Sequence, residues 1–279
     1  MQCGGNAPYL WAMRKDDSGI SFLYLNVAIH AALDAAEQLR KARKEGYTTT
    51  TKPDASLVTS ADLQADAIIT KHLETTGIPI LTEETETQVS DAQRADWNRF
   101  WIVDPLDGTR EYVDGKDEYT VNIALIERGV PTLGIIGIPE QRICYLTHPA
   151  MGPVRATEAD LRRLGASAAY VALPDQTTES LTAVVSRSHL RESTMNYIEK
   201  LREEHDGLVV ERSGSALKFC RIVEGSADLY PRFSPCMLWD IAAGEALLRS
   251  AGKSLKKVDD GLEIDYRTAP LLVPAFVAE

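Results

Sequence analysis

Cysteine is scarce in this sequence, and no two cysteines have the spacing of a redox or zinc motif. Its four cysteines are scattered over 279 residues, and the five histidines add no zinc-type cluster. This pattern excludes a disulfide-stapled secreted scaffold and a Cys/His zinc centre. We expect three of the four cysteines to be reduced residues of an apolar core.

Long apolar runs are also missing. No stretch approaches the length of a membrane-spanning helix, and residues 1–20 lack the continuous apolar segment of a secretory signal. We therefore expect a cytoplasmic protein without a transmembrane segment, with peripheral attachment to the inner membrane as an alternative. Residues 1–21 are expected to form a loosely ordered N-terminal extension.

Positive charge is in deficit. The chain has 30 Lys and Arg against 41 Asp and Glu, which gives a net charge of −11. This balance argues against nucleic-acid polymers and anionic membranes as partners. It leaves room for a small anionic substrate, because bound divalent cations reverse the local field.

Several nucleotide-binding and catalytic motifs are absent too. There is no phosphate-binding loop of the Gly-x-x-x-x-Gly-Lys-Ser/Thr type and no dinucleotide fingerprint. No Gly-x-Ser-x-Gly elbow is present, so acyl transfer has no support in the sequence.

Strand and helix patterns alternate along the chain and predict a layered α/β architecture. A helix is expected around residues 25–39, a buried strand at 78–81, and a hairpin from the runs 119–126 and 132–138. In the second half, strands at 182–186, 208–211 and 227–230 alternate with helices at 193–204, 215–223 and 239–251. The weakly patterned stretch after Ala150–Pro153 places a boundary there, with subdomains at 22–150 and 151–279.

The most informative stretch is Trp101-Ile-Val-Asp-Pro-Leu-Asp-Gly-Thr-Arg110, in which an apolar strand leads to Asp104 and Asp107. Buried carboxylates are costly unless cations hold them. Two acids on a proline-stiffened turn, with the carbonyl of Leu106 between them, suit Mg²⁺. Gly108 and Thr109 then begin a possible helix with free N–H groups for a phosphate. A metal-dependent phosphate-ester hydrolase is the first hypothesis.

Three further acids have both a structural and a functional interpretation. Asp62 lies in the first turn of a helix capped by Thr59 or Ser60, where it complements the helix dipole; a functional role is the alternative. Glu83 follows a buried strand and is either a surface acid or a metal ligand. Asp240 begins a helix, either as its N-cap or as a distant metal ligand.

Three segments combine hydroxyl groups with cations and could line an anion pocket. They are Ser186-Arg-Ser-His189, Ser213-Gly-Ser215-Ala-Leu-Lys218 and Tyr230-Pro-Arg232-Phe233. Each is also explained by turn chemistry, helix capping or packing.

Taken together, Glu83-Glu84, Asp104-Pro-Leu-Asp-Gly-Thr109 and Trp239-Asp240-x-Ala-Ala-Gly244 resemble the inositol monophosphatase superfamily of metal-dependent, lithium-sensitive phosphatases. The resemblance runs from about residue 22 to the C-terminus. It implies the layered α-β-α-β-α sandwich of the sugar-phosphatase fold. Within the superfamily the chain is most similar to the bacterial 3′(2′),5′-bisphosphate nucleotidases, which remove the 3′-phosphate of adenosine 3′,5′-bisphosphate, a by-product of sulfate assimilation.

The resemblance also implies a role for each motif residue. Two or three Mg²⁺ ions would be held by the ligands Glu83, Asp104, Asp107, Asp240 and the Leu106 carbonyl. The scissile phosphate would lie at residues 107–110, which are Asp107, Gly108, Thr109 and Arg110. Catalysis would involve Glu83, with Asp62 and Thr109 orienting the attacking water. The rest of the substrate would contact Ser186, His189, Ser213, Ser215, Lys218, Arg232 and Asp240.

The second phosphate of a bisphosphate needs cations that an inositol monophosphate does not. Arg110, Lys218 and Arg232 are the candidates, and Arg110 stands where such nucleotidases commonly carry lysine. An inositol or fructose-1,6-bisphosphate phosphatase on the same scaffold is the nearest alternative, and a catalytically silent nucleotide-binding sensor is a more distant one. The expected partner is a small phosphorylated molecule, and the chain is expected to be a monomer or a homodimer.

Overall fold

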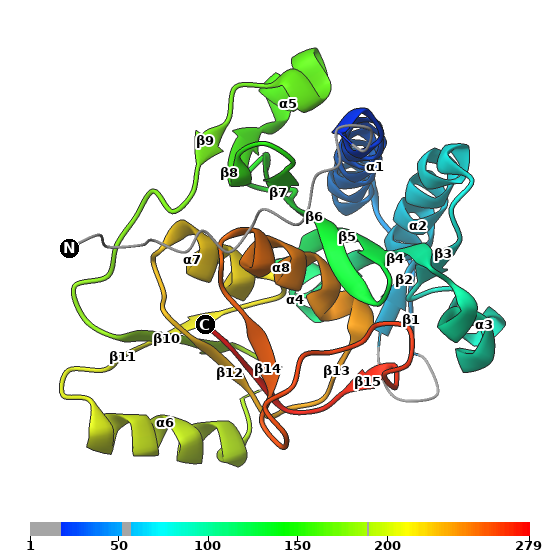
Figure 1. The fold of residues 1–279 in the computed structure, drawn as a ribbon. Helices are drawn as coiled ribbons and strands as arrows, with labels where there is room; N and C mark the ends of the chain where they lie inside the picture. Colours follow the sequence, from blue (N-terminus) through cyan, green and yellow to red (C-terminus); the bar gives the residue numbers. More distant parts are fainter. Residues whose placement is uncertain (1–17, 52–56, 189) are drawn as a thin grey trace, which may run out of the picture.

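A seven-stranded mixed sheet forms the centre of the molecule in the computed structural model, which describes residues 18–51, 57–188 and 190–279. Its strands follow the order β3-β4-β5-β6-β7-β8-β9 (Figure 1). β3 is parallel to β4, and every later pair is antiparallel. The strands are β3 (Ile80–Thr82), β4 (Arg99–Asp107), β5 (Thr120–Glu127), β6 (Val130–Ile138), β7 (Ile143–His148), β8 (Gly152–Thr157) and β9 (Val171–Ala172).

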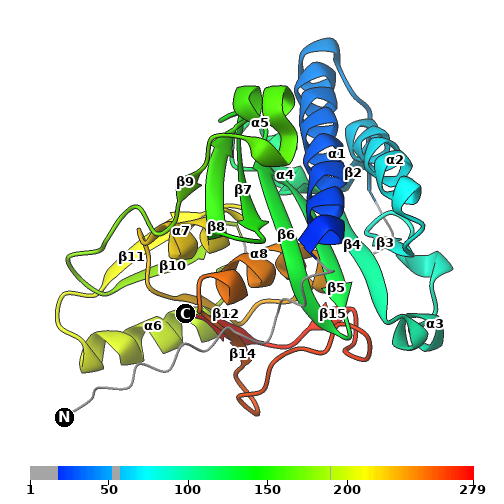
Figure 2. The same cartoon turned by 45° about the horizontal axis from the view of Figure 1, so that its top comes forward.

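Helices cover both faces of this sheet. α1 (Ser18–Glu45) and α2 (Ser60–Leu73) lie side by side over one face (Figure 2), and their apolar residues join one core cluster with those of β4, β5 and β6. α7 (Leu217–Glu224) and α8 (Leu238–Ser250) cover the other face within a second cluster. Because both faces are covered, β5 is buried along almost its whole length, and its sequence is mostly apolar rather than alternating between apolar and polar residues.

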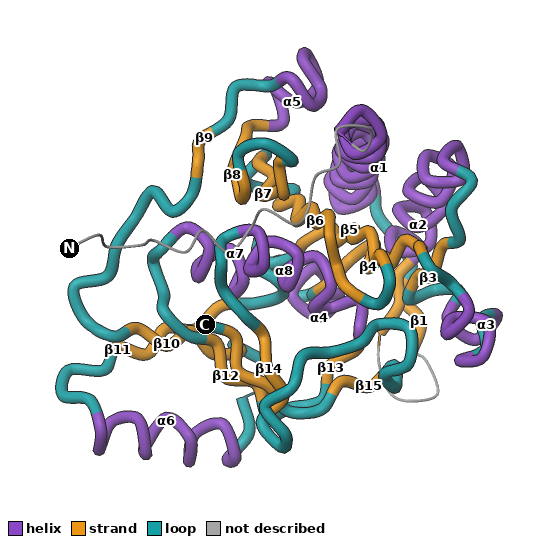
Figure 3. The backbone as a smooth tube through the Cα atoms, viewed as in Figure 1, coloured by secondary structure: helices purple, strands orange, loops and turns teal. Residues whose placement is uncertain are grey.

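A second layer of strands lies beyond α7 and α8. It contains β10 (Thr182–Ser186) parallel to β11 (Val209–Ser213), and the antiparallel set β12 (Tyr230–Arg232), β16 (Phe276–Ala278) and β14 (Leu255–Lys257). A bridge between Ala183 and Leu229 brings the two groups together. α6 (Glu192–Glu204) packs on the outside through a third, smaller cluster. The order helix, sheet, helix, sheet, helix is visible in Figure 3 and confirms the predicted fold class.

Shorter elements complete the chain between these layers. They are β1 (Thr49–Thr51) paired with β2 (Leu57–Thr59), β13 (Cys236–Met237) paired with β15 (Leu272–Val273), α3 (Asp91–Asp96), α4 (Thr109–Val113), α5 (Glu158–Leu164) and the 3-10 turns Glu74–Thr76, Glu86–Gln88 and Gly165–Ser167. Among the helices of the described ranges, none is both long enough and apolar enough to span a membrane. Cys144, Cys220 and Cys236 are free and buried, as expected for core thiols.

Most predicted elements are present, with ends that differ by a few residues. No element was predicted in two stretches: residues 154–181, which contain most of β8 and all of α5 and β9, and residues 253–279, which contain β14, β15 and β16. The predicted division at residue 150 stays a prediction, although β8 and β9 beyond it join the same central sheet. Residues 1–17 of the predicted extension lie outside the described residues, and residues 18–21 belong to α1.

The packing of α8 on β6 fixes one wall of the molecule. A Cβ atom on Gly134 of β6 would lie 2.4 Å from the backbone oxygen of Ala243 and 2.8 Å from the Cβ of Ala246. Real Cβ atoms do not approach so closely, so only glycine lets the α8 backbone lie this near the sheet. The close approach sets the position of every side chain on α8.

α8 also buries an ionisable group in the core. Glu245 is 1% exposed, its Oε2 accepts a hydrogen bond of 2.7 Å from the Tyr266 hydroxyl, and its Oε1 lies 3.6 Å from Nη1 of Arg249. Burial raises the pKa of Glu245 to about 7, although Tyr266 and Arg249 oppose the shift. The folded protein therefore holds this proton at a pH at which the unfolded chain releases it.

This difference makes the stability of the protein depend on pH through Glu245. Its contribution is complete below the unfolded pKa, near 4.5, and is lost as pH rises through about 7. Glu245→Gln keeps the shape and removes the titration. Chemical denaturation is expected to show the stability of the variant rising relative to wild type by up to about 3 kcal/mol between pH 4.5 and 8. Glu263→Gln, which removes the exposed partner of Arg249, is the control. A stability difference that does not change with pH would contradict this assignment.

Candidate functional site

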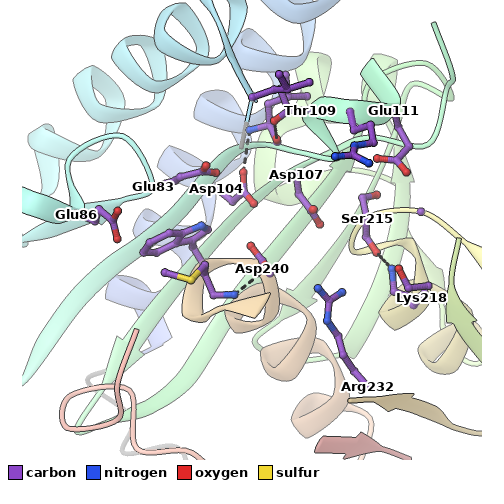
Figure 4. A pocket seen from close by; sticks show the side chains of 18 residues that line it. Glu83, Glu86, Asp104, Asp107, Thr109, Glu111, Ser215, Lys218, Arg232 and Asp240 are labelled. Atoms are coloured by element: carbon purple, nitrogen blue, oxygen red, sulfur yellow. Dashed lines mark hydrogen bonds between the residues drawn. The ribbon is translucent and has the colours of Figure 1, made fainter. Parts of the chain in front are cut away.

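A cleft of about 290 Å³ opens where the end of β4, the start of α4, the turn before α7 and the start of α8 meet (Figure 4). Most of the predicted site residues line it. They are Glu83, Asp104, Leu106, Asp107, Gly108, Thr109, Arg110, Ser186, Ser215, Lys218, Arg232 and Asp240. Residues more than 150 positions apart in the sequence thus share one cavity.

An irregular strand end presents two of the acids. β4 contains Asp104 and ends at Asp107, so the strand ends in the paired acids as the sequence indicated. Asp104 pairs with Asn122 and Asp107 with Thr120, and the register shifts between the two pairs. The irregularity coincides with Pro105, which has no N–H for the ladder, so the strand bulges and turns its acids toward the cleft.

Three aspartates face the same part of the cleft in Figure 4, and each has a carboxylate oxygen held by a fixed donor. The Leu106 N–H donates to Oδ1 of Asp104 at 3.0 Å, and the Met237 N–H donates to Oδ2 of Asp240 at 2.9 Å. Oδ2 of Asp107 accepts a longer bond of 3.4 Å from the Asn122 amide. The remaining oxygens of Asp104 and Asp240 make no hydrogen bond to any residue in the described ranges and are available to a ligand.

The aspartates oppose one another's ionisation. Burial and the charges of Glu83, Asp107 and Asp240 hold the pKa of Asp104 well above its usual range. Burial and Asp240 raise the pKa of Asp107 to about 7, while Lys218 pulls it down. Burial also raises the pKa of Asp240, against the effect of Arg232. A bound cation would relieve this repulsion, because it favours the charged form of every carboxylate around it.

The donors fit a hard divalent cation. Glu83, Asp104, Asp107, Asp240 and the carbonyl of Leu106 offer only oxygen, the ligand type that Mg²⁺ prefers. Within the described ranges, the side chains of His, Cys, Asp and Glu form no ready-made cage of three around one point. The case for a metal therefore rests on the kind of donors and on their mutual repulsion.

Asp62 caps α2 and also contacts a residue that lines the cleft. It is the third residue of α2, where Thr59 is the N-cap, and its Oδ2 accepts from the Thr59 N–H at 2.9 Å in a capping box. Its Oδ1 accepts a 3.1 Å hydrogen bond from the hydroxyl of Thr109. Asp62 is 2% exposed, and burial raises its pKa although Thr59 and Thr109 act in the opposite direction. It therefore reaches the cleft through Thr109 rather than directly.

Two cations, the buried Lys218 and the half-buried Arg232, line the cleft together with the aspartates. Lys218 is 2% exposed and donates to the carbonyls of Ser213, at 3.4 Å, and Ser215. Its ammonium lies 5.2 Å from the ring centre of Tyr230, and burial together with Arg232 lowers its pKa to about 8. Arg232 donates to the Tyr230 hydroxyl at 3.0 Å and to two backbone carbonyls. These contacts hold both cations in place, and both side chains line the cleft.

The other predicted residues take different positions. Ser186 is buried and lines the cleft, while Arg110 is exposed at its rim. Ser215 lines the cleft with a backbone φ of 39°, and its hydroxyl is buried with no partner among the described residues. Ser213 is buried just behind the cleft and contributes its carbonyl to Lys218. His189 lies outside the described residues.

The sequence analysis missed several residues of the cleft. Glu111 lines it, is 4% exposed, and accepts a hydrogen bond from the Ser188 hydroxyl. Its only signal was its place directly after Arg110. Asn122 contacts Asp107 from the neighbouring strand. A lone amide within an otherwise apolar strand could have identified it, because buried polar groups need partners. Leu57, Glu86, Gly214, Met237 and Trp239 complete the lining.

The carboxylate of Glu118 connects the segment after α4 with the segments that contain Arg187 and Gly214. Glu118 accepts two hydrogen bonds from the guanidinium of Arg187, at 2.6 and 2.7 Å. It also accepts one from the Gly214 N–H at 2.9 Å. Gly108 lies against this junction, since a Cβ there would be 3.1 Å from the Glu118 backbone oxygen and 3.4 Å from Cβ of Ser215.

Comparison with known proteins identifies close relatives. The profile of the inositol monophosphatase family matches residues 23–276. The 3′(2′),5′-bisphosphate nucleotidase CysQ of Salmonella typhimurium is 37% identical over 241 residues, which cover 86% of this chain and 88% of that protein. CysQ from Bacteroides thetaiotaomicron, a bacterial member of the inositol monophosphatase family, has a crystal structure with a TM-score of 0.79 at 34% identity, over 91% of this chain and 95% of that one.

A more distant solved structure shares the fold. An IMPase/NADP phosphatase, crystallised with Mg²⁺ and phosphate, has a TM-score of 0.68 at 20% identity, over 88% of this chain and 87% of that one. At this identity the likeness concerns the fold alone.

The contact at Gly108 gives a stability prediction. Gly108 and Gly115 both have a left-handed backbone, with φ of 91° and 75°, but a Cβ on Gly115 would meet only an Arg43 atom at 3.9 Å. Gly115→Ala is expected to cost about 1 kcal/mol of unfolding free energy from backbone strain. Gly108→Ala is expected to cost roughly 1 kcal/mol more, because the crowded junction must shift. Equal losses for the two variants in urea denaturation would show that the junction is not tightly packed.

Proposed function

Because the chain belongs to the inositol monophosphatase family and is a phosphatase of that family, we propose that it removes the 3′-phosphate from adenosine 3′,5′-bisphosphate. The names of its nucleotidase relatives support this substrate. The observation that carries the proposal is a pair of cations, the buried Lys218 and the half-buried Arg232, which line the same cleft as Asp104, Asp107 and Asp240. Such a cleft has one side for a metal-bound phosphate and another for a second phosphate.

The metal in this proposal is Mg²⁺, with two or three ions per site. The residues that would hold it are Glu83, Asp104, Asp107, Asp240 and the carbonyl of Leu106, which together line one side of the cleft. When bound, the metal lowers the pKa of a water and neutralises charge on the phosphoryl and leaving oxygens. Inhibition by Li⁺, as in the superfamily that the sequence resembles, is part of the proposal.

The contribution of the chain's own residues is to orient the attacking water. Thr109 donates its hydroxyl proton to Oδ1 of Asp62, and that acceptor is buried and fixed by the α2 capping box. The lone pairs of the Thr109 oxygen are then left to accept a hydrogen bond from a water in the cleft. Holding that water in line with the leaving oxygen is a positioning effect that enzymes of phosphoryl transfer depend on.

The second phosphate is the source of substrate choice in this proposal. Lys218 is already desolvated and Arg232 is partly so, and less hydration therefore remains to be lost when they bind an anion. Arg110 adds an exposed cation at the rim, and Ser215 offers a buried hydroxyl without a partner among the described residues. A substrate with a single phosphate leaves these groups uncompensated.

The cellular setting belongs to the same proposal. Hydrolysis of adenosine 3′,5′-bisphosphate would place the protein in sulfur metabolism, in the cytoplasm, as in the bacterial nucleotidases that its sequence resembles. Its state as a monomer or a homodimer stays a prediction.

The direct test is phosphate release from adenosine 3′,5′-bisphosphate, inositol 1-phosphate and fructose 1,6-bisphosphate, each with Mg²⁺ and with added Li⁺. The nucleotide is expected to have the highest kcat/KM.

Asp104→Asn, which removes the acid central to the cluster, is expected to lower kcat at least ~10²-fold with saturating Mg²⁺. Faster turnover of either sugar phosphate would reject the nucleotide assignment, and normal turnover by Asp104→Asn would reject the metal ligands.

The role of the Thr109 hydroxyl can be tested separately from the role of the side chain's shape. Thr109→Val is nearly isosteric but has no hydroxyl, whereas Thr109→Ser keeps the bond to Asp62. We expect Val to lower kcat by ~10²-fold or more with little change in KM, and Ser to stay within about tenfold of wild type. Similar kcat values for the Val and Ser variants would remove Thr109 from the mechanism.

A further inference from the structure

A second cavity, of about 270 Å³, lies at the C-terminal end of α1 and shares no lining residue with the catalytic cleft. Its lining consists of Arg40, Arg43, Lys44, Asp117, Glu140 and Arg142. Four cations thus face two carboxylates, in a chain whose net charge is −11. A cationic cavity on an acidic protein concentrates anions locally, which scattered surface lysines do not do.

Both carboxylates of this cavity are bound by a single arginine. Nη1 of Arg43 lies 3.1 Å from Oδ1 of Asp117 and 2.9 Å from Oε1 of Glu140. Oε1 of Glu140 also accepts a 2.7 Å hydrogen bond from the Tyr119 hydroxyl. Arg40 is held outside this group, by the Pro139 carbonyl and by Glu158. Both acidic side chains of the cavity, Asp117 and Glu140, are therefore already paired with Arg43.

The cations on the other side are free to bind a ligand. Lys44 and Arg142 are exposed, and neither forms an ion pair or a side-chain hydrogen bond with any residue in the described ranges. Arg142 lies in the turn between β6 and β7 with φ of 54°, a left-handed backbone that costs a non-glycine residue about 1 kcal/mol or more. A long cationic side chain is thus kept at a position that suits glycine or asparagine better.

The chemistry of the cavity selects its ligand. The carbonyl end of α1 carries partial negative charge, so any attraction for anions comes from the side chains rather than from the helix. Guanidinium groups match the geometry of phosphate and sulfate oxygens, and lysine adds a point charge. The expected ligand is a small molecule that carries a phosphate or sulfate group.

One segment connects this cavity to the catalytic cleft. Residues 109–119 begin with Thr109, Arg110 and Glu111 in the cleft. Near their other end, Glu118 accepts a hydrogen bond from the Gly214 N–H. Between them, Arg43 donates to the Lys116 carbonyl at 3.0 Å. The guanidinium of Arg43 also lies 5.9 and 5.5 Å from the ring centres of Tyr112 and Tyr119. The Tyr112 hydroxyl in turn donates to the Leu39 carbonyl of α1 at 2.8 Å. An anion that binds Arg43 would change the contacts of Arg43 with Lys116, Tyr112 and Tyr119, which belong to the same segment as Thr109.

We propose that this cavity is a second anion site, which binds a phosphate- or sulfate-bearing small molecule and acts on the catalytic cleft through residues 109–119. It differs from the substrate site in position and in composition, because it has an excess of cations and uses no aspartate of the cleft. The binding part of the proposal does not depend on the proposed substrate.

Binding is tested by calorimetric titration of the full chain with inorganic sulfate and, separately, inorganic phosphate. EDTA removes any divalent metal from the catalytic cleft, and chloride at equal ionic strength measures unspecific screening. Anion binding at Lys218 and Arg232 is distinguished because it does not depend on Lys44 or Arg142. The double variant Lys44→Gln/Arg142→Gln is expected to raise Kd at least about tenfold. The double variant Lys41→Gln/Arg163→Gln loses the same charge at exposed positions outside the cavity and is expected to bind like wild type. Equal Kd values in all three proteins, or no binding by wild type, would overturn the proposal.

Coupling is tested by phosphate release with Mg²⁺, with and without sulfate. Competition at the substrate site raises KM in every protein, whereas occupation of the second site is expected to change kcat. We expect a kcat change of about fivefold or more in wild type and in the control variant, and none in Lys44→Gln/Arg142→Gln. A kcat unaffected by sulfate in all three proteins would overturn the coupling, whichever phosphate ester is the substrate.

Discussion

The repulsion among buried carboxylates is the constraint on which the site depends. Asp104, Asp107 and Asp240 come from two elements that are far apart in the sequence, and each raises the cost of ionising another. A fold that only maximised its stability would separate them. Here the core holds them together: β4 is buried under helices on both faces, and α8 is packed against the same sheet. The hydrophobic core therefore concentrates this negative charge, and a bound cation would offset it. Groups whose pKa is perturbed in this way are common at functional sites.

Much of this arrangement could be predicted because it is local in the sequence. A buried strand followed by Asp-Pro-Leu-Asp-Gly indicates a turn that presents acids, and Thr59 with Asp62 has the spacing of a capping box. The hydrogen bond from Thr109 to Asp62 joins these two motifs across 47 residues. No pattern in either segment contains that contact; it was expected only through the resemblance to a family.

Other parts could not be predicted, for reasons that differ from residue to residue. Ser213 is the last residue of β11 and pairs with Ser186 of β10. In this position its carbonyl, rather than its hydroxyl, is the group that accepts a hydrogen bond from Lys218. Glu118 and Arg187 form their pair only after two layers have packed, and surface-type residues carry no periodic signal for such a contact. α5 and β9 are short and mostly exposed on one side, so the apolar spacing that reveals longer elements is absent.

The close contact between Gly134 and α8 has a consequence for motion. Asp240 is carried by a helix whose backbone cannot separate from β6 without opening the core, and β6 is two strands from Asp104 on β4. The acidic wall of the cleft therefore moves as one body. α7, which carries Lys218, packs on the same helix just as closely, because a Cβ on Gly244 of α8 would lie 2.2 Å from the Phe219 ring. The aspartates and Lys218 are therefore attached to one tightly packed body, whereas the polar contacts of Glu118 with Arg187 and Gly214 can separate without opening the core.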